Sequence, residues 1–111
     1  MTAIHNGYEH LADVADLPEG ALVAVTRSDG AEVCLFNHQG SIGAVSNVCT
    51  HAAFLISDGA LRPDGTLECA WHGARFDCRT GRVCRGPADE PLSVFPVQIE
   101  SNRVLVGPRV Q

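Results

Sequence analysis

Residues 47–77 read "NVCTHAAFLISDGALRPDGTLECAWHGARFD" and contain two short Cys/His pairs. Cys49 and His51 form a C-x-H pair, and after seventeen further residues Cys69 and His72 form a C-x-x-H pair. Thiolates and imidazoles at such short spacing are typical ligands of transition metals. Each pair is followed by glycine-bearing loop sequence, which lets backbone amides come close to a metal. The stretch therefore predicts a metal centre built from two loops.

The whole chain limits the class of protein that could carry such a centre. Its 111 residues fit one domain, residues 1–111, and a content of 45% hydrophobic and 19% charged residues is typical of a soluble globular protein. The start of the sequence lacks the features of a signal peptide and no stretch could span a bilayer, so we expect a cytoplasmic protein with no membrane partner. The net charge of -5 argues against a nucleic-acid partner, and partner proteins are expected instead.

Short β-rich runs alternate with turn signals along most of the chain. The runs are 23–27, 32–37, 41–45, 66–70, 74–77, 92–99 and 103–106. "SDG" and "HQG" separate the first three runs, which predicts a meander of three strands. Pro96 lies inside the sixth run and implies an edge strand or a bulge there. No segment shows a sustained helical period, so the sequence predicts an all-β fold, a small antiparallel sandwich or barrel with the Cys/His pairs on loops.

The chain has five cysteines, an odd number that cannot pair completely as disulfides. Disulfides are also rare in the cytoplasm, which makes metal ligation the better explanation for the two cysteines with a nearby histidine. The other three have no histidine at ligand spacing, and we expect them to be ordinary packed thiols, because free cysteine behaves as a small hydrophobic residue. They are Cys34, Cys78 and Cys84.

Two kinds of metal centre fit two cysteines and two histidines. One tetrahedral zinc ion would join the two loops into a structural interaction module without redox chemistry. A cluster of two irons and two sulfides could instead have both thiolates on one iron and both imidazoles on the other. Zinc fingers of the Cys2His2 type place cysteine with cysteine and histidine with histidine, whereas here each loop contributes one of each. Mixed pairs favour the cluster, and the zinc module remains the alternative.

Three segments carry a family resemblance: "CTHAAFLISDGAL" at 49–61, "CAWHGARFDCRTGRV" at 69–83 and "GPADEPL" at 86–92. Together they resemble the Rieske-type ferredoxins, and the resemblance extends from about residue 12 to residue 106. It implies a small Rieske domain that holds one [2Fe-2S] cluster, with cluster-binding loops at about 49–59 and 69–81 projecting from one tip of a β scaffold.

The resemblance also implies a ligand for each position of the cluster. Cys49 and Cys69 would bind the inner iron, while His51 and His72 would bind the outer, more exposed iron. The sequence departs from the family pattern at Ala70, which replaces the usual proline after the second cysteine. It departs again at "FLIS", which is bulkier than the small residues usual in the first loop. Neither departure affects a ligand.

The resemblance further separates subtypes of the family. Rieske proteins of respiratory complexes have an extra cysteine in each loop, where this chain has Phe54 and Trp71. Oxygenase α subunits add a mononuclear iron domain for which this chain is too short. We therefore expect a ferredoxin that is not itself an enzyme and that passes electrons from a flavin-dependent ferredoxin reductase to a terminal ring-hydroxylating oxygenase. The alternative is the small Rieske subunit of a nitrite reductase.

Two surface features suggest how such a carrier could meet its partners. Phe54 and Trp71 flank the ligand loops, either as a hydrophobic lid over the cluster or as an apolar docking patch. One end of the acidic molecule is also expected to be locally basic, either as a solvated loop face or as a patch that orients the carrier toward an acidic partner. The residues of this basic segment are Arg75, Arg79, Arg82 and Arg85.

The reduction potential is expected to lie low in the Rieske range. Hydrogen bonds from loop hydroxyls to sulfur raise the potential, and the respiratory type places a serine where this chain has Ala74. Phe76 likewise has no hydroxyl. We therefore expect a potential near about -150 mV, the lower limit of the range.

Overall fold

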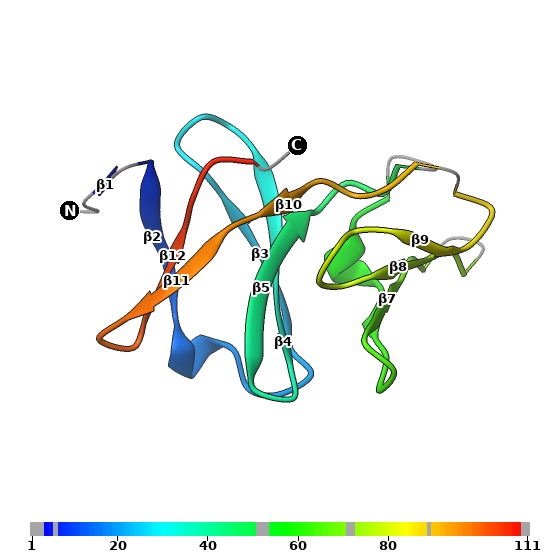
Figure 1. The fold of residues 1–111 in the computed structure, drawn as a ribbon, viewed down its shortest axis with the longest axis horizontal. Helices are drawn as coiled ribbons and strands as arrows, with labels where there is room; N and C mark the ends of the chain where they lie inside the picture. Colours follow the sequence, from blue (N-terminus) through cyan, green and yellow to red (C-terminus); the bar gives the residue numbers. More distant parts are fainter. Residues whose placement is uncertain (1–3, 6, 51–53, 71–72, 89, 110–111) are drawn as a thin grey trace.

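The computed structural model describes residues 4–5, 7–50, 54–70, 73–88 and 90–109, which form short antiparallel strands and two 3-10 helices (Figure 1). The strands are β1 (Ile4–His5), β2 (Tyr8–Asp13), β3 (Leu22–Thr26), β4 (Glu32–His38), β5 (Ser41–Ser46), β6 (Ala60–Leu61), β7 (Thr66–Glu68), β8 (Arg75–Asp77), β9 (Val83–Arg85), β10 (Val94–Phe95), β11 (Val97–Glu100) and β12 (Arg103–Val106). The helices are η1 (Val14–Asp16) and η2 (Ile56–Asp58). No helix in these ranges is long and apolar enough to cross a membrane.

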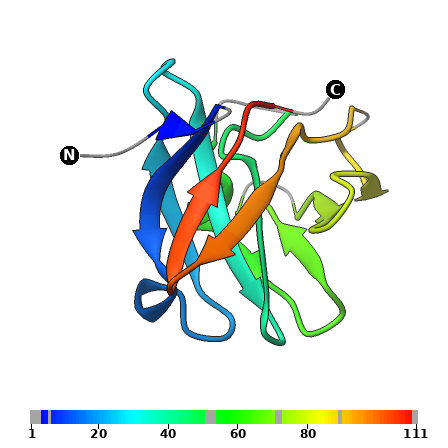
Figure 2. The same ribbon diagram turned by 60° about the vertical axis from the view of Figure 1, so that its left-hand side comes forward.

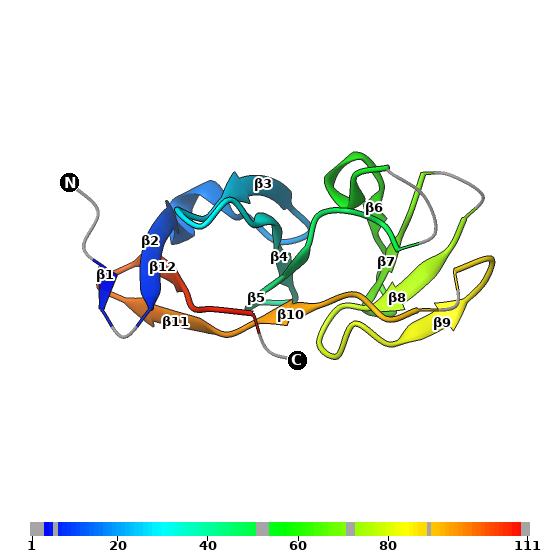
Figure 3. The ribbon, with the colours of Figure 1, turned by 90° about the horizontal axis from the view of Figure 1, so that it is seen from above.

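The strands form three four-stranded sheets arranged in two lobes. The sheets have the orders β1-β2-β12-β11, β10-β5-β4-β3 and β6-β7-β8-β9. The first two sheets face one another and make the larger lobe, while the third makes the smaller lobe beside them (Figure 3). Figure 2 shows β2, β12 and β11, in blue, red and orange, side by side on one face of the larger lobe. The antiparallel sheets confirm the expected all-β fold.

Strand β4 connects the cores of the two lobes, because alternate residues of a strand face opposite sides of a sheet. Val33 and Leu35 belong to the core of the larger lobe. Cys34 and Phe36 belong to the core that fills the smaller lobe. All four side chains are buried, which explains why this strand is a continuous apolar run rather than an alternation of apolar and polar residues. The strand thereby fixes the smaller lobe against the larger one.

Pro96 marks the point where the chain passes from one sheet to another. Before it, β10 pairs with β5, and after it, β11 pairs with β12. Proline has no N–H to donate to a strand ladder, but its carbonyl accepts a hydrogen bond of 2.8 Å from the N–H of Gly107. The expected single run 92–99 is therefore two short strands, separated at the residue that was expected to interrupt it.

Four strands were not predicted from the sequence: β1, β2, β6 and β9. The longest of them, β2, reads "YEHLAD" and has Glu9 as its one buried residue, so it shows no apolar alternation. It forms because it pairs with β12 along most of its length. The other three have only two or three residues each, too few to show a period.

Candidate metal centre

The first Cys/His segment begins directly after β5 and is closed at its base by Asn47. This residue is 1% exposed, and its own N–H donates to the carbonyl of Glu32 at 2.9 Å. Its backbone carbonyl accepts the N–H of Ile56 at 2.7 Å, and its side-chain oxygen accepts the N–H of Ser57 at 2.8 Å. One buried residue, through its backbone and its side chain, therefore joins both ends of the first loop to β4.

Both cysteines occupy the same position in their loops. The N–H of Cys49 donates to the carbonyl of Phe54 at 2.8 Å, and the N–H of Cys69 donates to the carbonyl of Ala74 at 2.7 Å. Each cysteine thus opens a loop that a backbone hydrogen bond closes five residues later. The second loop also continues the β7–β8 hairpin, whereas the first is an isolated hairpin with a bridge between Val48 and Leu55.

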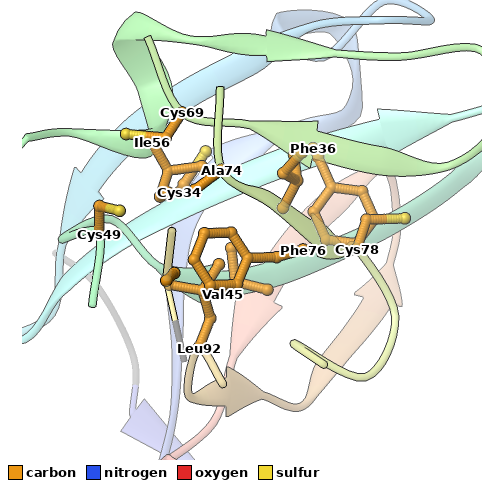
Figure 4. Close-up of a cluster of buried hydrophobic side chains, with 12 residues drawn as sticks. Cys34, Phe36, Val45, Cys49, Ile56, Cys69, Ala74, Phe76, Cys78 and Leu92 are labelled. Atoms are coloured by element: carbon orange, nitrogen blue, oxygen red, sulfur yellow. The ribbon is translucent and has the colours of Figure 1, made fainter. Parts of the chain in front are cut away.

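The two cysteine side chains belong to one buried apolar cluster. Cys49 is 3% exposed and Cys69 is 1% exposed. Figure 4 shows both at one end of the cluster, with Ile56 and Ala74 close by. A buried thiolate without a cation would be costly, whereas a metal that takes thiolate ligands makes the charged form favourable. The site therefore fits a metal centre whose two sulfur ligands are on its buried side.

Gly59 allows the two loops to approach each other. A Cβ placed on it would overlap the carbonyl oxygen of Glu68 and lie 3.3 Å from the backbone nitrogen of Ala70. The neighbouring Ala60 pairs with Glu68 in the ladder between β6 and β7. The end of the first loop consequently runs directly over the start of the second, and only a residue without a side chain fits there.

A third segment, between β9 and β10, is joined to the first loop by a hydrogen bond. The hydroxyl of Thr50 donates to the carbonyl of Glu90 at 2.7 Å. Beside this contact, Val48 is 40% exposed and Phe54 is 42% exposed. Such exposure favours a docking patch over a lid as the role of Phe54, while Trp71 lies outside the described residues.

The basic segment expected from the sequence is divided in the structure. Arg75 forms an ion pair with Glu68 at 3.3 Å, and Arg62 contacts the same carboxylate at 3.1 Å. The other three arginines of the segment are exposed and form no ion pair with the described residues; they are Arg79, Arg82 and Arg85. We call these three the hairpin arginines. Arg75 belongs to the predicted basic segment, but its charge is paired with Glu68 in the structure.

The remaining cysteines behave differently from one another. Cys34 and Cys78 are buried, as expected, and burial raises the pKa of the Cys34 thiol to about 12. Burial also raises the pKa of the Cys78 thiol, and the neighbouring Asp77 carboxylate adds to this effect. Cys84 is exposed, so the expectation that it packs was wrong. It lies on β9, the edge strand of its sheet, where the register of pairing with β8 shifts.

The structure brings together two of the four predicted ligands, Cys49 and Cys69. The other two, His51 and His72, lie outside the described residues, and within the described ranges no three potential ligand side chains converge on one point. Sequence reasoning missed Asn47, Gly59 and Glu68, which shape the loops. Their roles depend on contacts between segments, and a single residue type carries no signal for such contacts.

Comparison with known proteins gives consistent matches. The family model for the Rieske [2Fe-2S] domain matches residues 8–96. The ferredoxin component of a naphthalene 1,2-dioxygenase system from Pseudomonas aeruginosa is 40% identical over 91 residues, which cover 82% of this chain and 86% of that protein. The 3-phenylpropionate/cinnamic acid dioxygenase ferredoxin subunit from Shigella flexneri is 37% identical over 93 residues, covering 84% and 86%.

Solved structures agree with the sequence matches. A chain from the complex of reduced oxygenase and oxidized ferredoxin in carbazole 1,9a-dioxygenase superposes with a TM-score of 0.86 and 26% identity, over 93% of this chain and 94% of that chain. A nitrite reductase small subunit from Mycobacterium tuberculosis has a TM-score of 0.80 over 100% and 96% of the two chains, but at 23% identity it shows the fold alone. On the strength of the family match and these relatives, this chain belongs to the Rieske [2Fe-2S] domain family.

Proposed function

We propose that this protein is an electron carrier that takes electrons from a flavin-dependent ferredoxin reductase and delivers them to a terminal ring-hydroxylating oxygenase. Its cofactor is one Rieske-type [2Fe-2S] cluster, which accepts and releases one electron. The observation that carries the proposal is the match, over most of both chains, to ferredoxin components of two dioxygenase systems. Those relatives are electron-transfer components, and catalysis would belong to the oxygenase.

The proposed ligands are Cys49 and Cys69 on the inner iron and His51 and His72 on the outer iron. The burial of both cysteines and their equivalent positions in the two loops support the inner assignment. In each loop the histidine falls in the sequence between the cysteine and the residue that closes the loop. The surrounding residues shield the thiolates from water and hold the two loops close together.

The apolar edge formed by Val48 and Phe54 is the proposed contact with the oxygenase. Both side chains are exposed; Phe54 closes the first ligand loop and Val48 directly precedes it. Apolar contacts beside a redox centre exclude water and shorten the distance between donor and acceptor. The relative solved with an oxygenase supports a direct complex of this kind.

The proposed compartment follows from the supply of electrons. Flavin reductases of this kind draw electrons from reduced nicotinamide, so we propose that the protein works in the cytoplasm, where that cofactor is available. The nitrite reductase alternative is weaker, because its structural match shows only the fold.

A direct test uses the reduced protein and two possible acceptors. The cluster would be reduced photochemically and mixed in a stopped-flow instrument with the oxidised terminal oxygenase of a naphthalene dioxygenase system. The second acceptor would be the large subunit of a nitrite reductase. We expect fast reoxidation by the oxygenase only. Equal or faster reoxidation by the nitrite reductase subunit would contradict the proposal.

A further inference from the structure

A charged triad closes the base of the second ligand loop. Glu68 is the last residue of β7 and Arg75 is the first residue of β8, and the two face each other in the strand ladder. Glu68 accepts from Nε of Arg75 at 3.3 Å and from a terminal nitrogen of Arg62 at 3.1 Å. Glu68 and Arg75 stand at the two ends of the segment that contains Cys69 and His72, and Arg62 reaches the same carboxylate from beyond β6.

The Glu68 carboxylate lies beside that segment rather than pointing away from it. Glu68 directly precedes Cys69 in the chain, and a Cβ built on Gly73, the residue after His72, would be 3.5 Å from its Oε2. Glu68, Cys69 and Gly73 also line one hollow between the two loops. The carboxylate therefore lies close to both ends of the ligand segment: Glu68 directly precedes Cys69, and Gly73, next to the carboxylate, directly follows His72.

We propose that Glu68 sets the reduction potential of the cluster by balancing the charges of Arg62 and Arg75. The three residues together carry one net positive charge. Adding an electron to the cluster is favoured by positive charge nearby and opposed by negative charge. The Glu68 and Arg75 side chains are only 24% and 25% exposed, so solvent screens them less than it screens fully exposed charges. This inference rests on the proposed ligand set.

Neutral variants of the triad separate an electrostatic role from a structural one. Glu68→Gln leaves both arginines unbalanced and should raise the potential, whereas Arg75→Gln should lower it. The double variant restores the net charge of the triad while it removes the ion pair, so its potential should return close to the wild-type value. A loop distorted by loss of the ion pair would instead shift all three variants in the same direction.

The size of each shift follows from Coulomb's law with partial solvent screening. One unit charge added or removed near the cluster should change the reduction equilibrium by up to about tenfold, which corresponds to about 59 mV for one electron. Arg62→Gln offers a second version of the test, because it removes a positive charge while the cross-strand pair of Glu68 and Arg75 stays intact. It should lower the potential as well.

Glu100 and Arg103 provide matched controls. They form a Glu–Arg pair of register partners on β11 and β12, both exposed, in the larger lobe. Glu100→Gln and Arg103→Gln change the net charge of the protein by the same amounts as the triad variants. They lie beside the turn between β11 and β12, which Figure 1 shows at the opposite end of the molecule from β7 and β8. Their potentials should remain at the wild-type value.

The experiment is a redox titration of each purified holoprotein, with iron and sulfide measured on every sample. Opposite shifts for Glu68→Gln and Arg75→Gln, a double variant near wild type and unchanged controls would support the inference. The inference would be overturned if all potentials were equal or if both single variants shifted the potential in the same direction. It would also be overturned if the potential of the double variant differed from wild type by more than that of either single variant. A wild-type protein that holds no iron and sulfide would instead reject the cofactor assignment itself.

Discussion

Replacing Gly59 with alanine puts a methyl group against the backbone of the second ligand loop. The added Cβ would overlap the Glu68 carbonyl oxygen and would lie 3.1 Å from the carbonyl carbon. Its neighbours are backbone atoms, which cannot rotate away as a side chain can. The two loops would have to separate. We expect the free energy of unfolding to fall by about 3 kcal/mol, the upper end of the range for overpacked cores.

The separation should affect the cluster as well as the free energy of unfolding. Because each loop supplies one of the two buried cysteines, we expect Gly59→Ala to be purified with much less iron and a weaker visible absorbance. Gly20→Ala is the control, since its Cβ meets nothing within 4 Å and only its positive φ of 84° is unfavourable. The free energy of unfolding of the control should fall by about 1 kcal/mol, and the control should keep its cluster. Gly59→Ala with full iron content and the stability of the control would refute the close approach of the loops.

Three further predictions concern the potential, docking and acid stability. Ala74→Ser should raise the reduction potential in protein-film voltammetry, because Ala74 is fully buried beside Cys69 and a hydroxyl there can donate to sulfur; no upward shift would contradict the hydrogen-bond explanation. Electron transfer to an acidic partner should slow as salt rises, and reversing Arg79 and Arg82 to Glu should flatten this dependence while Arg103→Glu should not. Burial alone would raise the pKa of Asp77, but hydrogen bonds from the backbone N–H groups of Arg79 and Thr80 hold it below its ordinary value. Its ionised form therefore contributes stability above the ordinary pKa of about 4, and this is lost as pH falls through the lower folded-state value. The difference in unfolding free energy between wild type and Asp77→Asn should thus shrink in acid, and a constant difference would count against this explanation.

The parts of the fold that were predictable are those specified by local sequence. The meander of β3, β4 and β5 follows from "SDG" and "HQG", which mark tight turns between apolar runs. The interruption at Pro96 follows from its missing N–H. Strand β2 could not be predicted, because its pairing with β12 joins residues almost a full chain length apart.

In the candidate site, too, only the features specified by local sequence could be predicted. The cysteines and histidines were visible because metal ligands need particular residue types at short spacing. The pairing of Arg75 with Glu68 was not visible, because a run of arginines shows charge but not the strand register that neutralises one of them. The exposure of Cys84 likewise depends on a register shift on an edge strand.

The central claim is that two cysteines and two histidines of this chain hold one [2Fe-2S] cluster that carries a single electron. Pulsed electron paramagnetic resonance of the reduced protein, prepared with 15N-labelled histidine, tests it most directly. We expect one unpaired electron per two irons, coupled to two histidine nitrogens, with one coupling missing in any His51 or His72 variant that retains iron. A reduced cluster without histidine coupling, or a purified protein that contains zinc and gives no signal, would contradict the account.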